Sequence, residues 1–159
     1  MKKMFLLLTI ISLIFTGCAS TEKVENPSAD IEKVFEIDLE KNQIYDLSLQ
    51  FIAENFKSAK AVLEYQDREA GRIIGNGSTT ITTNDLTFGY HSYPADFTMI
   101  IDARDNRYRV TFRNLQWTLA DGAIRPVEYK VPYDILLREL DNILVRLHSY
   151  LLNRNNDDF

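Results

Sequence analysis

The sequence predicts an α+β domain of two layers, in which two amphipathic helices cover one face of a curved, mostly antiparallel sheet. Two segments, near residues 42–56 and 133–152, repeat apolar side chains at helical spacing. The remaining segments alternate apolar and polar residues, which predicts the order strand, helix, four strands, helix. We therefore expect a single domain at residues 31–153, followed by a frayed tail at 154–159.

Residues 34–39 open the domain as a strand, because Phe35, Ile37 and Leu39 alternate with polar residues. Asn42 is then the expected N-cap of the first helix. The apolar stripe of this helix consists of Ile44, Leu47, Phe51, Ile52 and, at its end, Phe56. Such a stripe is typical of a helix that lies against a sheet.

Residues 61–66 and 72–83 predict the next two strands, joined by a tight connection. Gly71 ends this connection and suits the left-handed backbone conformation that short turns often need. The Gly75-Asn76-Gly77 segment predicts a bulge or a sharp bend in the second of these strands. A phosphate-binding loop is disfavoured there, because neither a Lys-Ser/Thr pair nor a helix follows the glycines.

The clearest local signal is a hairpin of residues 97–101 and 107–115, which turns at Asp105 and Asn106. In this register one face carries the pairs Ala103–Tyr108, Ile101–Val110 and Met99–Phe112. The other face carries the pairs Asp102–Arg109, Ile100–Thr111 and Thr98–Arg113. Because a shift of one residue would exchange the faces, we expect the first face to meet the helices and the second to stay open.

Residues 86–96 give no clear element, and Pro94 argues against a central strand there. After Pro126 and Pro132, residues 133–152 predict the longest helix of the chain. Its apolar stripe consists of Leu136, Leu140, Ile143, Leu144, Leu147, Tyr150 and Leu151. This stripe predicts that the helix lies across the sheet and covers much of the core.

The first eighteen residues have the features of a bacterial lipoprotein export signal. Lys2 and Lys3 precede Met4–Phe15, an apolar run of 12 residues that is too short for a membrane span of about 20. Thr16-Gly17-Cys18 resembles the end of a lipobox, at which a signal peptidase cuts before the cysteine. This resemblance implies a signal peptide at residues 1–17 and a diacylglycerol and a further acyl chain, such as palmitate, on Cys18.

Cleavage would leave residues 18–30 as an acylated cysteine and a flexible tether, because these residues lack apolar periodicity. Ala19 and Ser20, with no aspartate after the cysteine, resemble the signal for transfer to the outer membrane. We therefore expect a protein of the cell envelope that is anchored by lipid in the outer membrane and faces the periplasm.

The composition limits the classes of partner. The chain of 159 residues has 18 basic and 23 acidic side chains, which gives a net charge of −5. Loss of residues 1–17 removes Lys2 and Lys3 but no acidic residue, so the mature chain carries −7. We expect no nucleic acid partner, because binding to phosphates depends on clustered Lys and Arg. Cys18 is the only cysteine, so neither a disulfide nor a cysteine metal site is expected, and no cofactor or metal motif is present.

Three segments resemble a known family: residues 52–62, Tyr65–Gly77 with the sequence YQDREAGRIIGNG, and Asp102–Val110 with the sequence DARDNRYRV. They are similar to an uncharacterised bacterial domain family described as having a TATA-binding-protein-like (TBP-like) fold. The resemblance covers roughly residues 34–152. It implies this fold and frequent export, but it brings no established activity and no catalytic residue. The name of the fold does not imply DNA binding, because function depends on sites rather than on folds.

The densest positive group of this acidic chain is predicted to lie on the open face of the sheet. It consists of Arg107, Arg109 and Arg113, with Thr111 between them and Arg104 nearby. We interpret the group as a candidate binding patch for an envelope protein or an anionic ligand. The alternative is a solvated face in which Arg109 makes an ordinary cross-strand pair with an aspartate.

An enzyme site would have to use other residues. Asp67 and Glu69 lie in the tight connection, where solvent leaves little to shift their pKa values. His91 lies in the segment without a clear element, and no spacing links it or His148 to further metal ligands. We expect a membrane-anchored, non-enzymatic binding or accessory domain. An envelope hydrolase or other enzyme with a loop site near His91 or Asp67, and a structural envelope component, are the alternatives.

Overall fold

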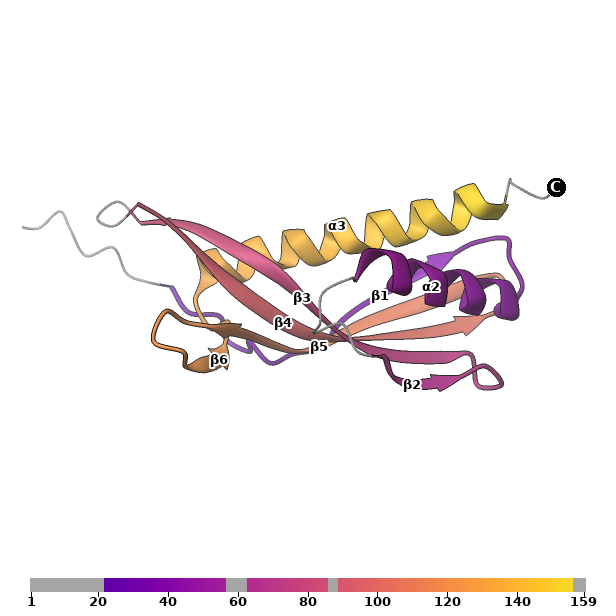
Figure 1. Cartoon of the computed structure of the whole chain (residues 1–159), viewed down its shortest axis with the longest axis horizontal. Coiled ribbons are helices and arrows are strands. Elements are labelled where there is room, and N and C mark those ends of the chain that lie inside the picture. Colours follow the sequence, from indigo (N-terminus) through magenta and orange to yellow (C-terminus); the bar gives the residue numbers. More distant parts are fainter. Residues whose placement is uncertain (1–21, 57–62, 86–88, 156–159) are drawn as a thin grey trace, which may run out of the picture.

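The computed structural model describes residues 22–56, 63–85 and 89–155, which form one sheet and two helices (Figure 1). Along the chain the elements are β1 (Ile31–Glu36), α2 (Lys41–Asn55), β2 (Leu63–Asp67), β3 (Arg72–Asp85), β4 (Gly89–Arg104), β5 (Arg107–Thr118), β6 (Ile124–Pro126) and α3 (Lys130–Asn155). The sheet is antiparallel in the order β1-β5-β4-β3-β2, and β6 pairs with the end of β5. The predicted α+β class is confirmed, and β6 is one strand more than predicted.

Both helices lie on the same side of the twisted sheet, and their apolar stripes meet the apolar face of β3, β4 and β5 (Figure 1). In α3 the predicted stripe is buried, with Tyr150 half-buried at its end. In α2 the buried residues are Ile44, Tyr45, Ser48, Phe51 and Ile52. Since a buried aliphatic or aromatic side chain stabilises the fold by about 1.5–3 kcal/mol, these two stripes hold the layers together.

The predicted hairpin is confirmed in register as well as in position. All six predicted pairs are present, and Asn106 has the expected positive φ of 62°. The turn also organises the chain before α2: the Asn106 carbonyl accepts a hydrogen bond from the Ile37 N–H (3.0 Å), and the Asn106 N–H donates to the Leu39 carbonyl (2.9 Å). The Asp105 carboxylate accepts from the Lys41 N–H at 2.8 Å, where α2 begins.

These contacts explain why the first two boundaries were predicted wrongly. β1 spans residues 31–36 rather than 34–39, because Ile37 and Leu39 turn away to bond the hairpin turn, although both are buried. The helix begins two residues earlier than expected, and its N-cap is Glu40 rather than Asn42. The Glu40 N–H donates to the Gln43 side-chain oxygen at 3.0 Å, as in a capping box.

Of the bulge or sharp bend predicted at Gly75-Asn76-Gly77, the bulge is not found in β3. β3 pairs with β4 without a break from Arg72 to Asp85. The register shifts instead opposite Gly75, between Leu63 and Tyr65 of β2, and in the pairing of β4 with β5, where Asn114 has a positive φ of 54°. Glycine at position 77 leaves room for the Phe97 ring, because a Cβ at this position would lie 2.5 Å from that ring.

Residues 89–96 belong to a long strand, which corrects the expectation drawn from Pro94. Pro94 pairs with Thr80 of β3. On its other side, the pairing with β5 ends at Ala95 and Trp117 in the described part of the chain. Proline has no N–H to donate, so it is tolerated where a strand has a neighbour on only one side. Residues 86–88 lie outside the described residues.

The segment before β1 is bound to the domain. Val24 N–H donates to the Glu128 carbonyl (2.8 Å), and Lys130 N–H donates to the Glu22 carbonyl (2.9 Å). Further along, Asp30 forms an ion pair with Arg113 at 2.7 Å. The predicted tether of residues 18–30 is thus held to the fold from Glu22 onward, and Cys18 and the predicted signal peptide lie outside the described residues. At the other terminus α3 continues to Asn155, beyond the predicted start of the tail.

Candidate functional site

The sheet face opposite the helices is hollowed at the end that carries the β4–β5 turn. The hollow has a volume of about 220 Å³, and we call it the arginine groove. Its lining residues are Val34, Arg72, Asp102, Arg104, Arg107, Tyr108 and Arg109. They come from β1, β3, β4 and β5, so the groove depends on the pairing of four strands.

Strand alternation determines which side chains reach the groove. Ala103 and Tyr108 are buried toward the helices, so their neighbours in β4 and β5 point to the open face. Cross-strand register then aligns Arg72, Asp102 and Arg109 in one row. The sequence brings two arginines to opposite sides of one carboxylate because the three strands are neighbours.

Asp102 holds two guanidinium groups in fixed positions. Its Oδ1 accepts a hydrogen bond from Arg72 Nε at 2.6 Å, and its Oδ2 accepts from Arg109 Nη2 at 2.8 Å. Burial of Asp102, whose side chain is 16% exposed, opposes its ionisation, but the hydrogen bonds from both arginines outweigh burial and lower its pKa. The hydrogen bonds to Asp102 likewise raise the pKa values of Arg72 and Arg109. All three groups are therefore charged at neutral pH.

The next row of the groove carries two arginines and one acidic residue, because Glu36 of β1 pairs in register with Arg107. Arg104 and Arg107 lie directly opposite each other beside the turn, and both are exposed. Across the described residues, neither guanidinium has an ion pair or a side-chain hydrogen bond. Like charges placed opposite each other destabilise a sheet, and an anion between them would relieve the repulsion. Guanidinium groups bind carboxylates and phosphates through paired hydrogen bonds, so this row offers an anion site.

The predicted patch is only partly assembled in the structure. Arg107 and Arg109 lie in the groove, whereas Arg113 lies further along β5 and is bound to Asp30. Thr111 is 4% exposed, so its hydroxyl is not accessible to a large partner. Arg72 was missed, because it comes 30 residues before Asp102 in the chain and only the β3–β4 register brings it there.

Beyond the groove the polar residues of the open face bind one another. The Asn76 amide donates to Glu64 Oε1 (2.5 Å), and its oxygen accepts from the Thr98 hydroxyl (2.9 Å). The Asn114 amide donates to the same hydroxyl at 3.2 Å. This chain of hydrogen bonds links four strands, so these groups hold the sheet together.

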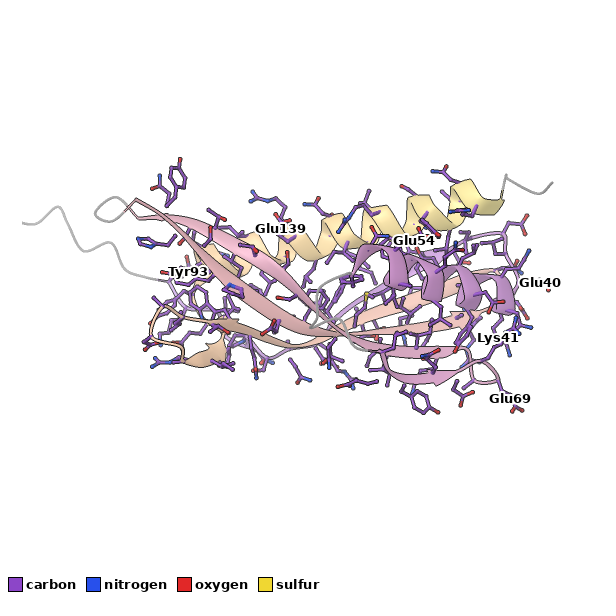
Figure 2. The ribbon with its side chains drawn as sticks, in the orientation of Figure 1. Glu40, Lys41, Glu54, Glu69, Tyr93 and Glu139 are labelled. Carbon is purple, nitrogen blue, oxygen red and sulfur yellow. The ribbon has the colours of Figure 1, made fainter. Side chains whose placement is uncertain are left out.

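The residues considered for an enzyme site have structural partners. Asp67 accepts hydrogen bonds from the Ala70 N–H (2.8 Å) and the Tyr65 hydroxyl (2.9 Å), and both lower its pKa. The Glu69 backbone carbonyl accepts a hydrogen bond from Lys41 Nζ at 2.8 Å, at the end of the molecule shown on the right of Figure 2. In the described residues no group of three or more His, Cys, Asp or Glu is placed to hold a metal ion.

The two histidines lie in different parts of the molecule and have different partners. His91 stacks against Tyr93, with ring centroids 6.3 Å apart, at the opposite end of the molecule (Figure 2). Along β4, His91 and Asp102 are about 36 Å apart at 3.3 Å per residue. His148 Nδ1 is hydrogen bonded to the Tyr108 hydroxyl at 3.0 Å, and Phe35 stacks on both rings. His91 and Asp67 thus cannot act in one site.

The architecture defines a two-layer α+β domain, and neither helix of the described residues covers its second sheet face (Figure 1). Residues 32–118 match the family described as a domain of unknown function (DUF4468) with TBP-like fold. Because this match covers more than half of the chain, the protein belongs to that family. A search of the curated proteins found no match.

Two solved structures share the fold. A crystal structure of a DUF4468 family protein from Bacteroides ovatus has a TM-score of 0.65 and 13% identity, and the alignment covers 84% of this chain and 91% of that one. A crystal structure of a TBP-like protein from Parabacteroides distasonis has a TM-score of 0.66 and 13% identity, over 82% of this chain and 96% of that one. At this identity the similarity concerns the fold alone, and it confirms the predicted TBP-like architecture.

Proposed function

We propose that the protein is a lipid-anchored component of the cell envelope whose domain is a non-enzymatic binding module. In this proposal the arginine groove binds an anionic group of an envelope partner. The observation that carries it is the pair Arg104 and Arg107, two exposed guanidinium groups placed opposite each other beside a third and a fourth arginine.

Binding is favoured over catalysis by the kinds of charge in the groove. General acid–base catalysis needs a group whose pKa lies near the working pH. In the groove the pKa of Asp102 is lowered and the pKa values of Arg72 and Arg109 are raised, so none of these three groups exchanges protons near neutrality. The groove can therefore attract and orient an anion, but it offers no proton donor or acceptor for a reaction.

The anchor rests on the export signal and the lipobox at Cys18. Among the described residues no helix is long and apolar enough to cross a membrane. With two or three acyl chains, an anchor on Cys18 would hold the protein stably at a bilayer without a spanning helix. The outer membrane, with the domain on its periplasmic side, is the location that Ala19 and Ser20 favour.

Fluorescence anisotropy with a labelled hexaglutamate peptide tests the groove. We expect saturable binding that weakens as salt rises, because exposed charges are screened over about 10 Å at 0.1 M ionic strength. The double variant Arg104→Gln/Arg107→Gln should bind at least tenfold more weakly. Arg146→Gln is the matched control, since Arg146 is exposed on α3, on the other side of the molecule. Equal binding by the double variant and the control would refute the site.

The partner itself can be sought by photo-crosslinking in cells. A photoreactive residue at Val34, an exposed residue of the groove, should capture an envelope partner through an acidic segment. The same probe at Val145, exposed on α3, should not capture that partner. Capture of the same protein from both positions would show that the groove does not select it.

A further inference from the structure

The start of the described chain is fastened to one particular place on the domain. Lys23 forms a β-bridge with Tyr129, and its ammonium group lies 3.0 Å from Glu128 Oε2 and 5.3 Å from the centre of the Tyr129 ring. Together with the backbone hydrogen bonds of Glu22 and Val24, these contacts fix where the chain leaves the domain. Only three residues lie between Cys18 and Glu22, so the four steps from one Cα to the other extend over at most about 14 Å.

That place lies at the end of the molecule far from the arginine groove. The start of the described chain lies at the left of Figure 1, together with the N-terminus of α3, strand β6 and the first residues of β4. The β4–β5 turn lies at the right. From Tyr90 to Arg104, strand β4 extends over about 46 Å at 3.3 Å per residue. A lipid on Cys18 would therefore hold this end, and not the groove, next to the bilayer.

The same end exposes large apolar side chains from three elements. Tyr90 of β4 is 79% exposed, Ile124 of β6 is 62% exposed and Val131 of α3 is 66% exposed. A single exposed apolar residue is ordinary on a protein surface, but these three lie at the end where the tether leaves. Tyrosine suits the boundary between water and lipid in particular, because its ring is apolar and its hydroxyl is polar.

The charges at this end do not favour an electrostatic partner. Lys23 is paired with Glu128, and Lys130 lies 3.6 Å from the Asp134 carboxylate. These two lysines are thus neutralised by neighbours, and Arg125, beside Ile124, is the exposed basic residue in β6 for which the described residues show no ion pair. A surface of this kind fits the interfacial region of a bilayer better than it fits an acidic protein.

We propose that the tether end of the domain, defined by Tyr90, Ile124 and Val131, rests on the membrane that the Cys18 anchor enters. The long axis of the domain then points away from the bilayer, and the arginine groove lies at the end far from the membrane. This inference rests on the lipid anchor of the proposed function but not on anion binding by the groove. A lipid is the expected partner of this surface because the link of residues 18–21 is short and Glu22 is bound at this end of the domain.

Quenching by lipids tests this orientation. The full chain, processed and acylated in its host, is purified from membranes and placed in phosphatidylcholine vesicles that contain doxyl-labelled lipid. Single cysteines are introduced for a fluorophore at Ser92 and Arg125, next to Tyr90 and Ile124, and at Arg107 in the groove. We expect strong quenching at positions 92 and 125, none at position 107, and no change when salt is raised to an ionic strength of about 1 M.

A surface variant distinguishes contact of the tether end with the bilayer from anchoring of the protein by its lipid alone. Tyr90→Ser/Ile124→Ser/Val131→Ser should reduce quenching at position 125 severalfold while the protein stays on the vesicles through its lipid. All three residues are exposed, so the fold should tolerate the changes. Undiminished quenching in this variant, equal quenching at positions 107 and 125, or a protein that leaves the vesicles would each overturn the proposal. Loss of hexaglutamate binding with this quenching pattern intact would instead refute only the groove.

Discussion

Gly71 and Gly122 form a natural pair for testing how the turn before β3 is built. Both have positive φ, 70° and 81° respectively. At Gly71 a Cβ would lie 2.5 Å from the Ala103 carbonyl oxygen, whereas at Gly122 a Cβ would meet no atom within 4 Å. Alanine at either position must therefore adopt an unfavourable backbone conformation, but only at position 71 does it also collide with the neighbouring strand.

The expected magnitudes follow from this difference. A left-handed conformation costs a residue with a Cβ about 1–2 kcal/mol, which is the loss expected for Gly122→Ala. Gly71→Ala should lose about 1 kcal/mol more, because relieving the collision pulls the Ala103 backbone from its 2.7 Å hydrogen bond to the Gly71 carbonyl. We therefore expect Gly71→Ala to lower the free energy of unfolding by about 2–3 kcal/mol.

Urea unfolding of the purified protein measures both changes. The single tryptophan, Trp117, is buried beside Tyr93 and lies far from Gly71, so its fluorescence reports unfolding of the whole domain. The midpoint should shift for each variant while the slope with urea stays constant. Equal destabilisation by the two substitutions would show that the contact with Ala103 is not what requires glycine at position 71.

Four further predictions concern the core, the groove and the anchor. Leu140→Ala should cost about 2–5 kcal/mol in urea unfolding by opening a cavity under α3, and a loss below 1 kcal/mol would mean that the helix repacks. Tyr108→Phe should cost about 1 kcal/mol, and a double-mutant cycle with His148→Leu should show that the two side chains are coupled. Because the pKa of Asp102 is lowered in the fold, its stabilising contribution should be complete above its unfolded pKa of about 3.9 and disappear as pH falls through the lower folded value. Asp102→Asn should remove that part of the acid dependence, and an unchanged pH profile of unfolding would contradict the assignment. Cys18→Ser should abolish acyl labelling in cells and leave an unprocessed precursor, whereas equal labelling of the variant would exclude Cys18 as the anchor.

Local patterns were sufficient for the elements whose residues specify their own partners. The hairpin register could be predicted because its strands are joined by a two-residue turn, and because only one register places Met99, Ile101 and Ala103 on the same face as Tyr108 and its apolar neighbours. The last helix could be predicted because its apolar stripe, from Leu136 to Leu151, continues over about four turns. Each of these signals is contained in a short stretch of chain.

Only the tertiary structure determined what depends on contacts between distant residues. Ile37 leaves β1 because the hairpin turn, about 70 residues later in the chain, takes its backbone hydrogen bond. Pro94 is accepted in β4 because β5 ends beside it, which is a property of the neighbouring strand.

Contacts between distant residues also determined the composition of the candidate site. The basic residues of the hairpin could be identified from the sequence. The groove, however, is also lined by Arg72 of β3, and Arg113 is not part of it but forms an ion pair with Asp30. Local sequence determined which face of the hairpin is polar. Long-range strand pairing decided that Arg72 and Arg109 form ion pairs with Asp102, whereas Arg104 and Arg107 form none in the described residues, because charge compensation acts through space and not along the chain.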